Sequence, residues 1–149
     1  MIRVQREDFD VAVELASLGK GRTDLGGVVT FVGLVRGAPD GVRAMTLEHY
    51  PGMTEKALAG IAARAVARWP GIEVAVVHRF GPLAPGERIV FVGVAAAHRG
   101  EAFAACEFLV DWLKTQAPFW KLEERPEGAR WVEARQEDDA RAQRWKNTP

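Results

Sequence analysis

The stretch that decides the fold covers residues 98–121 and reads HRGEAFAACEFLVDWLKTQAPFWK. Its apolar residues recur at helical spacing, which predicts a helix over about 99–115, and Pro118 disfavours any continuation. A His-Arg pair opens this helix, one lysine lies near its end, and a second lysine follows an aromatic pair. Cations beside apolar residues are costly to hold unless an anion binds there, so the stretch is a candidate anion site. The residues expected to face the core are Phe103, Cys106, Val110 and Leu113.

Working outward from this helix, the chain alternates between strand-like and helix-like patterns. Strands are expected over residues 1–5, 28–35, 44–50, 73–80 and 88–95, helices over 9–18 and 54–69, and a terminal hairpin over 119–124 and 130–134. We expect the strand over 28–35 to be buried and to pair with the strand over 44–50. The polar segment 136–149 is expected to be frayed or weakly helical. This order predicts an α+β fold with a mixed or antiparallel sheet in a single domain.

Polar residues at suitable positions can cap the first two helices. Asp8 or Asp10 can cap the first, and Thr54 can cap the second. The apolar stripe of the first helix is expected to consist of Val11, Leu15 and Leu18. The apolar face of the second is expected to consist of Leu58, Ile61, Ala62, Ala65 and Trp69.

The composition is that of an ordinary globular domain with balanced charge. The chain has 149 residues, and its 20 lysines and arginines equal its 20 aspartates and glutamates. This balance argues against wholesale nucleic-acid binding, although a local basic pocket stays possible. No apolar run approaches a membrane span and the first residues lack a signal-peptide core, so we expect a cytoplasmic location. Cys106 is the single cysteine, which excludes an intrachain disulfide, and its spacing favours a place in the core over a nucleophilic role.

Cationic residues in and near the opening stretch are the main candidates for chemistry. The set consists of Arg36, His98, Arg99, Lys114 and Lys121. Arginines could hold a phosphate and leave a lysine for proton transfer. A structural explanation competes, because a lysine at a helix end is favoured by the helix dipole and a strand lysine can point to solvent. Among the other histidines, His78 is expected to be structural, and His49 is balanced between strand packing and a site wall.

The length of the helix over 99–115 limits which residues can share a site. Arg99 and Lys114 are fifteen residues apart, which corresponds to roughly 22 Å at 1.5 Å per residue. A small ligand cannot easily touch both within one chain. Either a second subunit supplies His98 and Arg99 to a composite site in a dimer, or only one end of the helix matters.

Five segments in order carry a resemblance to a known family. They are VVTFVGLVRG (28–37), LEHYPGMTEKAL (47–58), HRFGPLAPGE (78–87), VGVAAAHRGEAFAACEFLVDWLKTQAPFWK (92–121) and EGARWVEAR (127–135). On these segments the chain resembles the large, catalytic subunit of molybdopterin synthase. The resemblance assigns residues 1–135 to a large-subunit domain and leaves 136–149 as a polar C-terminal tail.

The resemblance implies a fold, a reaction and partners. The implied fold is an α/β hammerhead with an additional antiparallel β-sheet. The implied reaction converts cyclic pyranopterin monophosphate to molybdopterin with two sulfurs from the thiocarboxylated C-terminal glycine of a small ubiquitin-like subunit. The implied assembly is a heterotetramer built on a homodimer of large subunits. No metal or redox cofactor is implied for this step.

By position, the resemblance also implies roles for individual residues. The two catalytic lysines correspond to Lys114 and Lys121. The implied substrate-contacting residues are Leu34, Val35, Arg36, His98, Arg99, Lys114, Lys121, Leu122, Glu123 and Arg135. Leu34 replaces a lysine that many members carry, so it could contribute only backbone or apolar contact. A non-catalytic module that grips a glycine-rich tail or a phosphate ligand stays open as an alternative.

Overall fold

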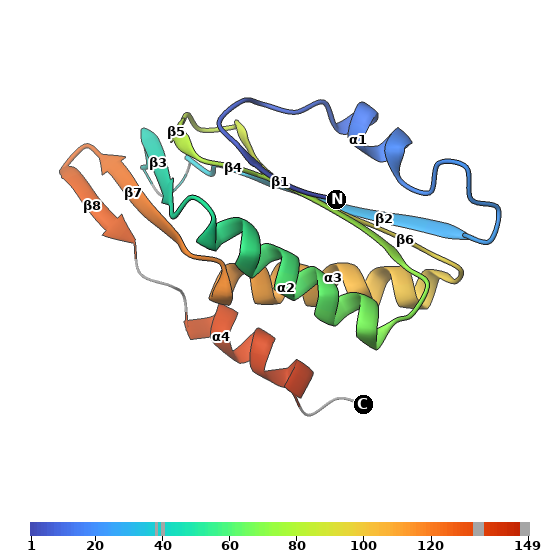
Figure 1. The fold of residues 1–149 in the computed structure, drawn as a ribbon. Coiled ribbons are helices and arrows are strands. Elements are labelled where there is room, and N and C mark those ends of the chain that lie inside the picture. Colours follow the sequence, from blue (N-terminus) through green and yellow to red (C-terminus); the bar gives the residue numbers. More distant parts are fainter. Residues whose placement is uncertain (38, 40, 133–135, 147–149) are drawn as a thin grey trace.

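The computed structural model describes residues 1–37, 39, 41–132 and 136–146. Helices and strands alternate along the chain in a mixed α/β fold (Figure 1). In chain order the elements are β1 (Ile2–Gln5), α1 (Val11–Ser17), β2 (Gly27–Leu34), β3 (Ala44–His49), α2 (Met53–Arg68), β4 (Glu73–Arg79), β5 (Gly81–Leu83), β6 (Arg88–Ala96), α3 (Arg99–Gln116), β7 (Phe119–Arg125), β8 (Gly128–Val132), α4 (Gln136–Gln143) and the 3₁₀ turn η1 (Arg144–Lys146). No helix in the described part of the chain is long and apolar enough to cross a membrane.

The first sheet has the strand order β1-β4-β6-β2, with β1 parallel to β4 and the other neighbours antiparallel. Helices α2 and α3 cover one face of this sheet, and α1 lies on the other side (Figure 1). The main core lies between the sheet and the two long helices, where Val92, Val94 and Leu109 are almost fully buried. A smaller cluster that includes Phe9, Leu18 and Phe91 fills the face beneath α1. The sheet is therefore buried on both faces.

The second sheet has the order β5-β3-β7-β8 and is antiparallel throughout. The expected pairing of 28–35 with 44–50 is wrong, because β2 pairs with β6 and β3 pairs with β5 and β7. The chain leaves the first sheet at Val35, whose N–H donates to the Glu87 carbonyl at 2.9 Å and whose carbonyl accepts from the Gly86 N–H at 2.7 Å. These two bonds hold Val35 against the β5–β6 loop and direct the next strand into the other sheet.

Strand β2 forms an edge of the first sheet, which corrects the expectation of a buried strand. Among the described residues β6 is its one neighbour, and Val28, Phe31 and Leu34 are exposed to 43%, 36% and 55%. A run of β-branched and apolar residues indicates a strand, but it does not reveal how many neighbours that strand has.

Helix α1 is capped by Asp10, whose carboxylate accepts from the N–H groups of Ala12 and Val13 at 2.9 and 3.2 Å. Its apolar stripe is only partly as expected, because Leu15 is exposed and Leu18 is buried. The residue that α1 itself buries is Glu14, which forms an ion pair with Arg3. A seven-residue helix presents too short a face for its periodicity to fix orientation.

Helix α2 buries the expected face but begins differently from the prediction. Its cap is Gly52 at a φ of 85°, and the Glu55 carboxylate accepts from the Gly52 N–H at 2.6 Å. Thr54 lies inside the helix, where its hydroxyl accepts from the Tyr50 N–H and donates to the Pro118 carbonyl at 3.2 Å. Thr54 therefore ties the start of α2 to the turn after α3.

Helix α3 buries a face that the sequence identified only in part. Cys106 and Leu113 are buried as expected, but Phe103 is 62% exposed. Burial raises the pKa of the Cys106 thiol to about 11, so this residue is an uncharged part of the core. The face that packs inward is wider than the expected stripe and also includes Ala102, Ala105, Phe108, Leu109 and Trp112.

The polar end of the chain is helical and packs on α3. Asp111, buried on α3, accepts hydrogen bonds from Arg141 at 3.3 Å, Arg144 at 3.0 Å and the Trp145 indole N–H at 2.8 Å. The Trp145 ring also meets Phe108 edge-on at a centroid distance of 5.5 Å. Of the two expectations for this segment, the helical one is correct. The predicted hairpin is confirmed up to Val132, and residues 133–134 lie outside the described residues.

Candidate functional site

A cavity of about 560 Å³ lies where the two sheets meet the end of α3. Strands β2, β4, β6 and β7 and helices α3 and α4 each contribute to its wall. Its apolar part includes Phe31, Val90, Val92, Leu113 and Phe119. Its charged and polar part consists of Arg36, His78, Lys114, Lys121, Glu123 and Asp138. A cavity with an apolar wall and a few convergent polar groups has the character of a ligand site.

The break at Pro118 brings the two lysines to one cavity. Helix α3 ends with the Ala117 N–H on the Leu113 carbonyl at 3.3 Å, and the Phe119 N–H then donates to the Ala117 carbonyl at 2.9 Å. Strand β7 starts directly after this tight turn, so Lys121 lies only a few residues beyond the helix that carries Lys114. Lys114 is exposed at the rim, and Lys121 is half-buried.

Arg36 joins the lysines from the other sheet. It follows β2 and Val35, and the two backbone bonds between Val35 and the β5–β6 loop fix its place in space. Arg36 lines the same cavity as Lys114 and Lys121. Three cationic side chains from three different segments therefore surround one space, as an anionic ligand requires.

Not all of the expected site residues line this cavity. Leu34 and Glu123 do, in addition to the three cations. Val35 is buried with both backbone polar groups already bonded, and Leu122 lies on the opposite face of β7 from Lys121. Arg135 lies outside the described residues.

The His-Arg pair lies at the far end of α3. His98 and Arg99 are exposed and do not line the cavity that Lys114 lines. Helix α3 spans eighteen residues from Arg99 to Gln116, so its start and its end are separated by the length of the helix. The geometry within one chain therefore matches the expectation that both ends cannot serve the same small ligand.

Sequence reasoning assigned His78 a structural role, but this residue lines the cavity from β4. Its Nδ1 bonds to the Arg79 carbonyl at 2.8 Å, and its ring stacks on Phe119 at a centroid distance of 3.8 Å. Burial is the main cause that lowers the pKa of His78 to about 4, and the charges of Lys121 and Lys114 lower it further. A polar residue that ends an apolar strand was the only sequence signal for it.

Two carboxylates complete the polar wall, and one of them comes from the C-terminal helix. Glu123 is buried and pairs with Arg125 at 2.6 Å. Asp138 reaches the cavity from α4, which the Asp111 contacts hold on α3. Sequence reasoning missed Asp138 because nothing in the polar tail indicates that it folds back. Among the described residues, no group of three or more His, Cys, Asp or Glu side chains is arranged to hold a metal ion.

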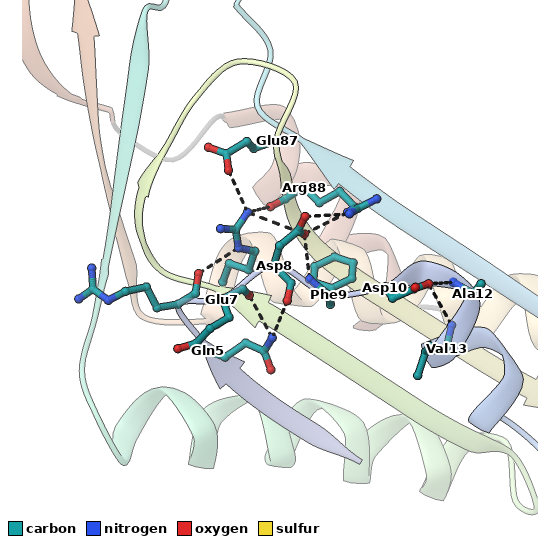
Figure 2. A network of polar contacts seen from close by, with 11 residues as sticks. Gln5, Glu7, Asp8, Phe9, Asp10, Ala12, Val13, Glu87 and Arg88 are labelled. Carbon is teal, nitrogen blue, oxygen red and sulfur yellow. Dashed lines mark hydrogen bonds and ion pairs between the residues drawn. The ribbon is translucent and has the colours of Figure 1, made fainter.

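A polar network around Asp8 joins the segment after β1 to Glu87 and Arg88 (Figure 2). Asp8 accepts two hydrogen bonds from Arg88, which hold the pKa of the Asp8 carboxyl below its ordinary value. The buried Arg79 guanidinium donates to the Arg6 and Arg88 carbonyls at 3.1 and 3.0 Å and lies 3.6 Å from the Glu87 carboxylate. Since Glu87 also bonds Val35, one network joins the segments that carry His78 and Arg36.

The fold and the cavity define a class of mixed α/β protein in which three cationic side chains converge at the junction of two sheets. The family model described as "MoaE protein" matches residues 4–116. The chain belongs to the MoaE family. It is 58% identical over 146 residues to the molybdopterin synthase catalytic subunit of Pseudomonas aeruginosa, with 97% of each chain covered. It is 56% identical to the protein of the same name from Ralstonia nicotianae, with 97% of this chain and 83% of the relative covered.

Solved structures agree with this family. The molybdopterin biosynthesis MoaE protein from Burkholderia ambifaria is 57% identical, with a TM-score of 0.85 and coverage of 98% of this chain and 97% of that chain. The molybdopterin synthase structure from Staphylococcus aureus is 31% identical, with a TM-score of 0.81 and coverage of 88% and 96%. The resemblance read from the five segments is thereby confirmed, and so is the single-domain mixed fold with two sheets.

Proposed function

We propose that this chain converts cyclic pyranopterin monophosphate to molybdopterin as the catalytic subunit of a molybdopterin synthase. Family membership and relatives of that name make it a sulfur-transferring enzyme of molybdenum-cofactor biosynthesis. The observation that carries the substrate assignment is the convergence of Arg36, Lys114 and Lys121 on one cavity of about 560 Å³. A phosphate-bearing heterocycle needs both this charge and the apolar wall beside it.

The sulfur comes from the thiocarboxylated C-terminal glycine of a small ubiquitin-like subunit. The thiocarboxylate sulfur attacks a substrate carbon and forms a C–S bond while a C–O bond at the same carbon breaks. The departing oxygen takes up a proton, and the partner's acyl group stays attached through sulfur. Water then cleaves the acyl–sulfur bond, returning a carboxylate to the partner and leaving the sulfur on the substrate. A second round installs the second sulfur. In this scheme Lys114 and Lys121 transfer protons and stabilise the developing oxyanions.

The site is composite in the proposed assembly. His98 and Arg99 lie too far from the cavity of their own chain to touch its ligand, so they reach the cavity of a second copy in a homodimer. One small subunit binds at each end of that dimer, which gives a heterotetramer. The enzyme works in the cytoplasm.

Lys121→Ala tests the catalytic role directly. Loss of a proton-transfer group typically costs 10²- to 10⁴-fold in rate, so product formation should fall by about that factor. The measurement is single-turnover formation of molybdopterin from the precursor and the thiocarboxylated small subunit. The matched control is Lys56→Ala, which changes one exposed lysine of α2 and should retain the wild-type rate.

The same experiment separates the enzyme from a non-catalytic module. Co-purification of the small subunit with wild-type chain but no product from the precursor would support the module. Turnover by Lys121→Ala at the wild-type rate would remove the role assigned to Lys121.

A further inference from the structure

Four aromatic rings contact one another in a column that ends at the cavity, and two of the rings are histidines. Phe80 and His49 lie 4.1 Å apart, His49 and Phe119 lie 6.4 Å apart, and Phe119 and His78 lie 3.8 Å apart, all between ring centroids. Only the last two rings of the column, Phe119 and His78, line the cavity. The chain thus offers two histidines in the same kind of packing, of which His78 lines the cavity and His49 does not.

The hydrogen bond to the Arg79 carbonyl fixes the tautomer of His78. A carbonyl oxygen can only accept, so Nδ1 must carry the hydrogen in its 2.8 Å bond to the Arg79 carbonyl. A neutral imidazole has one N–H, which leaves Nε2 with a lone pair. Within the described part of the chain, no group donates a hydrogen bond to Nε2. Burial and the two lysines keep the ring neutral at physiological pH.

A neutral acceptor is uncommon among the groups that line this cavity. Arg36, Lys114 and Lys121 only donate. The other polar side chains of the wall are the carboxylates of Glu123, which is paired with Arg125, and Asp138. A carboxylate at position 78 would form ion pairs with the lysines and cancel part of the charge that attracts the ligand. A neutral imidazole accepts a hydrogen bond from the ligand and leaves that charge intact.

We propose that His78 is a ligand-binding residue whose Nε2 accepts a hydrogen bond from an amide-type N–H of the molecule that occupies the cavity. The identity of that molecule rests on the proposed function. A pterin ring carries such an N–H, and so does the backbone of a glycine-rich tail, so the two sources need separate experimental arms. Phe119 supports the ring by stacking, and Arg79 sets its orientation through the carbonyl.

The variant His78→Phe removes the acceptor and keeps an aromatic ring that can stack on Phe119. The matched control is His49→Phe, which makes the same change in the same column outside the cavity. Isothermal titration calorimetry is carried out with cyclic pyranopterin monophosphate in one arm and with the unmodified small subunit in the other. Loss of one hydrogen bond corresponds to about tenfold weaker binding, so we expect that loss in one arm for His78→Phe and in neither arm for His49→Phe. His78→Gln, which retains an acceptor oxygen, should recover part of the affinity.

A spectroscopic measurement on the wild-type chain does not depend on the folding of any variant. In chain labelled with ¹⁵N-histidine, the Nε2 resonance of His78 should move upfield when the ligand saturates the site, and the Nδ1 resonance should stay in place. An unmoved Nε2 resonance at saturation, or equal affinities of His78→Phe and wild type in both arms, would overturn the proposal. If wild type still forms molybdopterin when the His78 proposal fails, the proposed function survives. If wild type binds neither ligand, the His78 proposal and the proposed function both fail.

Discussion

At the scale of the residue, the buried imidazole of His78 couples folding to pH. Its pKa is about 4 in the folded chain against an ordinary value of 6.5, so between these values the unfolded chain binds a proton that the folded chain rejects. This group's contribution is therefore complete above pH 6.5 and is lost as pH falls toward 4. From pH 7 to pH 4.5 the linkage amounts to about 2–3 kcal/mol of unfolding free energy.

Urea unfolding at pH 7 and pH 4.5 measures this dependence. His78→Phe has no titrating group at that position, so its unfolding free energy should decline by about 2–3 kcal/mol less than that of wild type over this interval. His78→Gln is the second non-titrating variant and should behave in the same way. Identical pH dependence in all three chains would contradict a neutral buried imidazole.

At the scale of the element, the buried carboxylate of Asp111 on α3 helps to hold the C-terminal helix. Asp111→Ala removes the acceptor of the Trp145 indole and one of the two carboxylates that bind Arg141 and Arg144, the other being Glu107. Because both arginines are about half exposed and can turn to water, we expect a local cost of about 2 kcal/mol rather than global unfolding. Hydrogen exchange over residues 136–146 should accelerate in this variant.

The matched control is Asp139→Ala, which removes an exposed carboxylate from α4 itself. Its exchange over the same residues should stay close to that of wild type. Equal protection of α4 in Asp111→Ala would show that the Glu107 ion pairs and the Trp145 ring contacts suffice to hold it. The domain boundary after residue 135 stays a prediction, because residues 133–135 lie outside the described residues.

Local periodicity predicted the elements better than their neighbours. The apolar face of α2 and the strands β4 and β6 are as expected, because each follows from a period within one segment. The predicted partner of β2 was wrong. The chain turns away from β2 at Val35, whose backbone bonds to a loop some fifty residues away, and such a contact leaves no local pattern in the sequence. Phe103 was placed in the core by spacing alone, although its position on α3 faces outward.

At the scale of the whole molecule, the proposed composite site has a test that needs no new structure. In an equal mixture of Arg99→Ala and Lys121→Ala chains, half of the dimers are hybrids, and each hybrid has one site with both residues intact. We therefore expect about a quarter of wild-type activity after subunit exchange, because half of the sites in half of the dimers are complete. The measurement is molybdopterin formation before and after exchange.

Each variant incubated alone for the same time is the control and should stay inactive. Native mass spectrometry should confirm that hybrids form. With each variant inactive alone, hybrids without recovered activity would mean that Arg99 serves the site of its own chain.

The site was less accessible to sequence reasoning than the fold. Lys114 and Lys121 stood out through their spacing around Pro118, and Arg36 was a candidate as a cation on a loop. The cavity itself was not predictable, because its wall combines segments from Phe31 to Asp138 that only the two-sheet arrangement brings together. His78 was expected to be structural because its strand looked buried, and only the tertiary structure shows that it also lines the cavity.

The origin of the cavity wall has a consequence for how a ligand acts on the chain. Since β2, β4, β6, β7, α3 and α4 all contribute, no partly folded form that lacks one of them retains the complete site. A ligand that binds only the complete site stabilises the whole chain by mass action, by about 2.7 kcal/mol at a hundredfold excess over its dissociation constant. Substrate supply thereby becomes a determinant of how long the folded chain survives proteolysis, in addition to how fast it turns over.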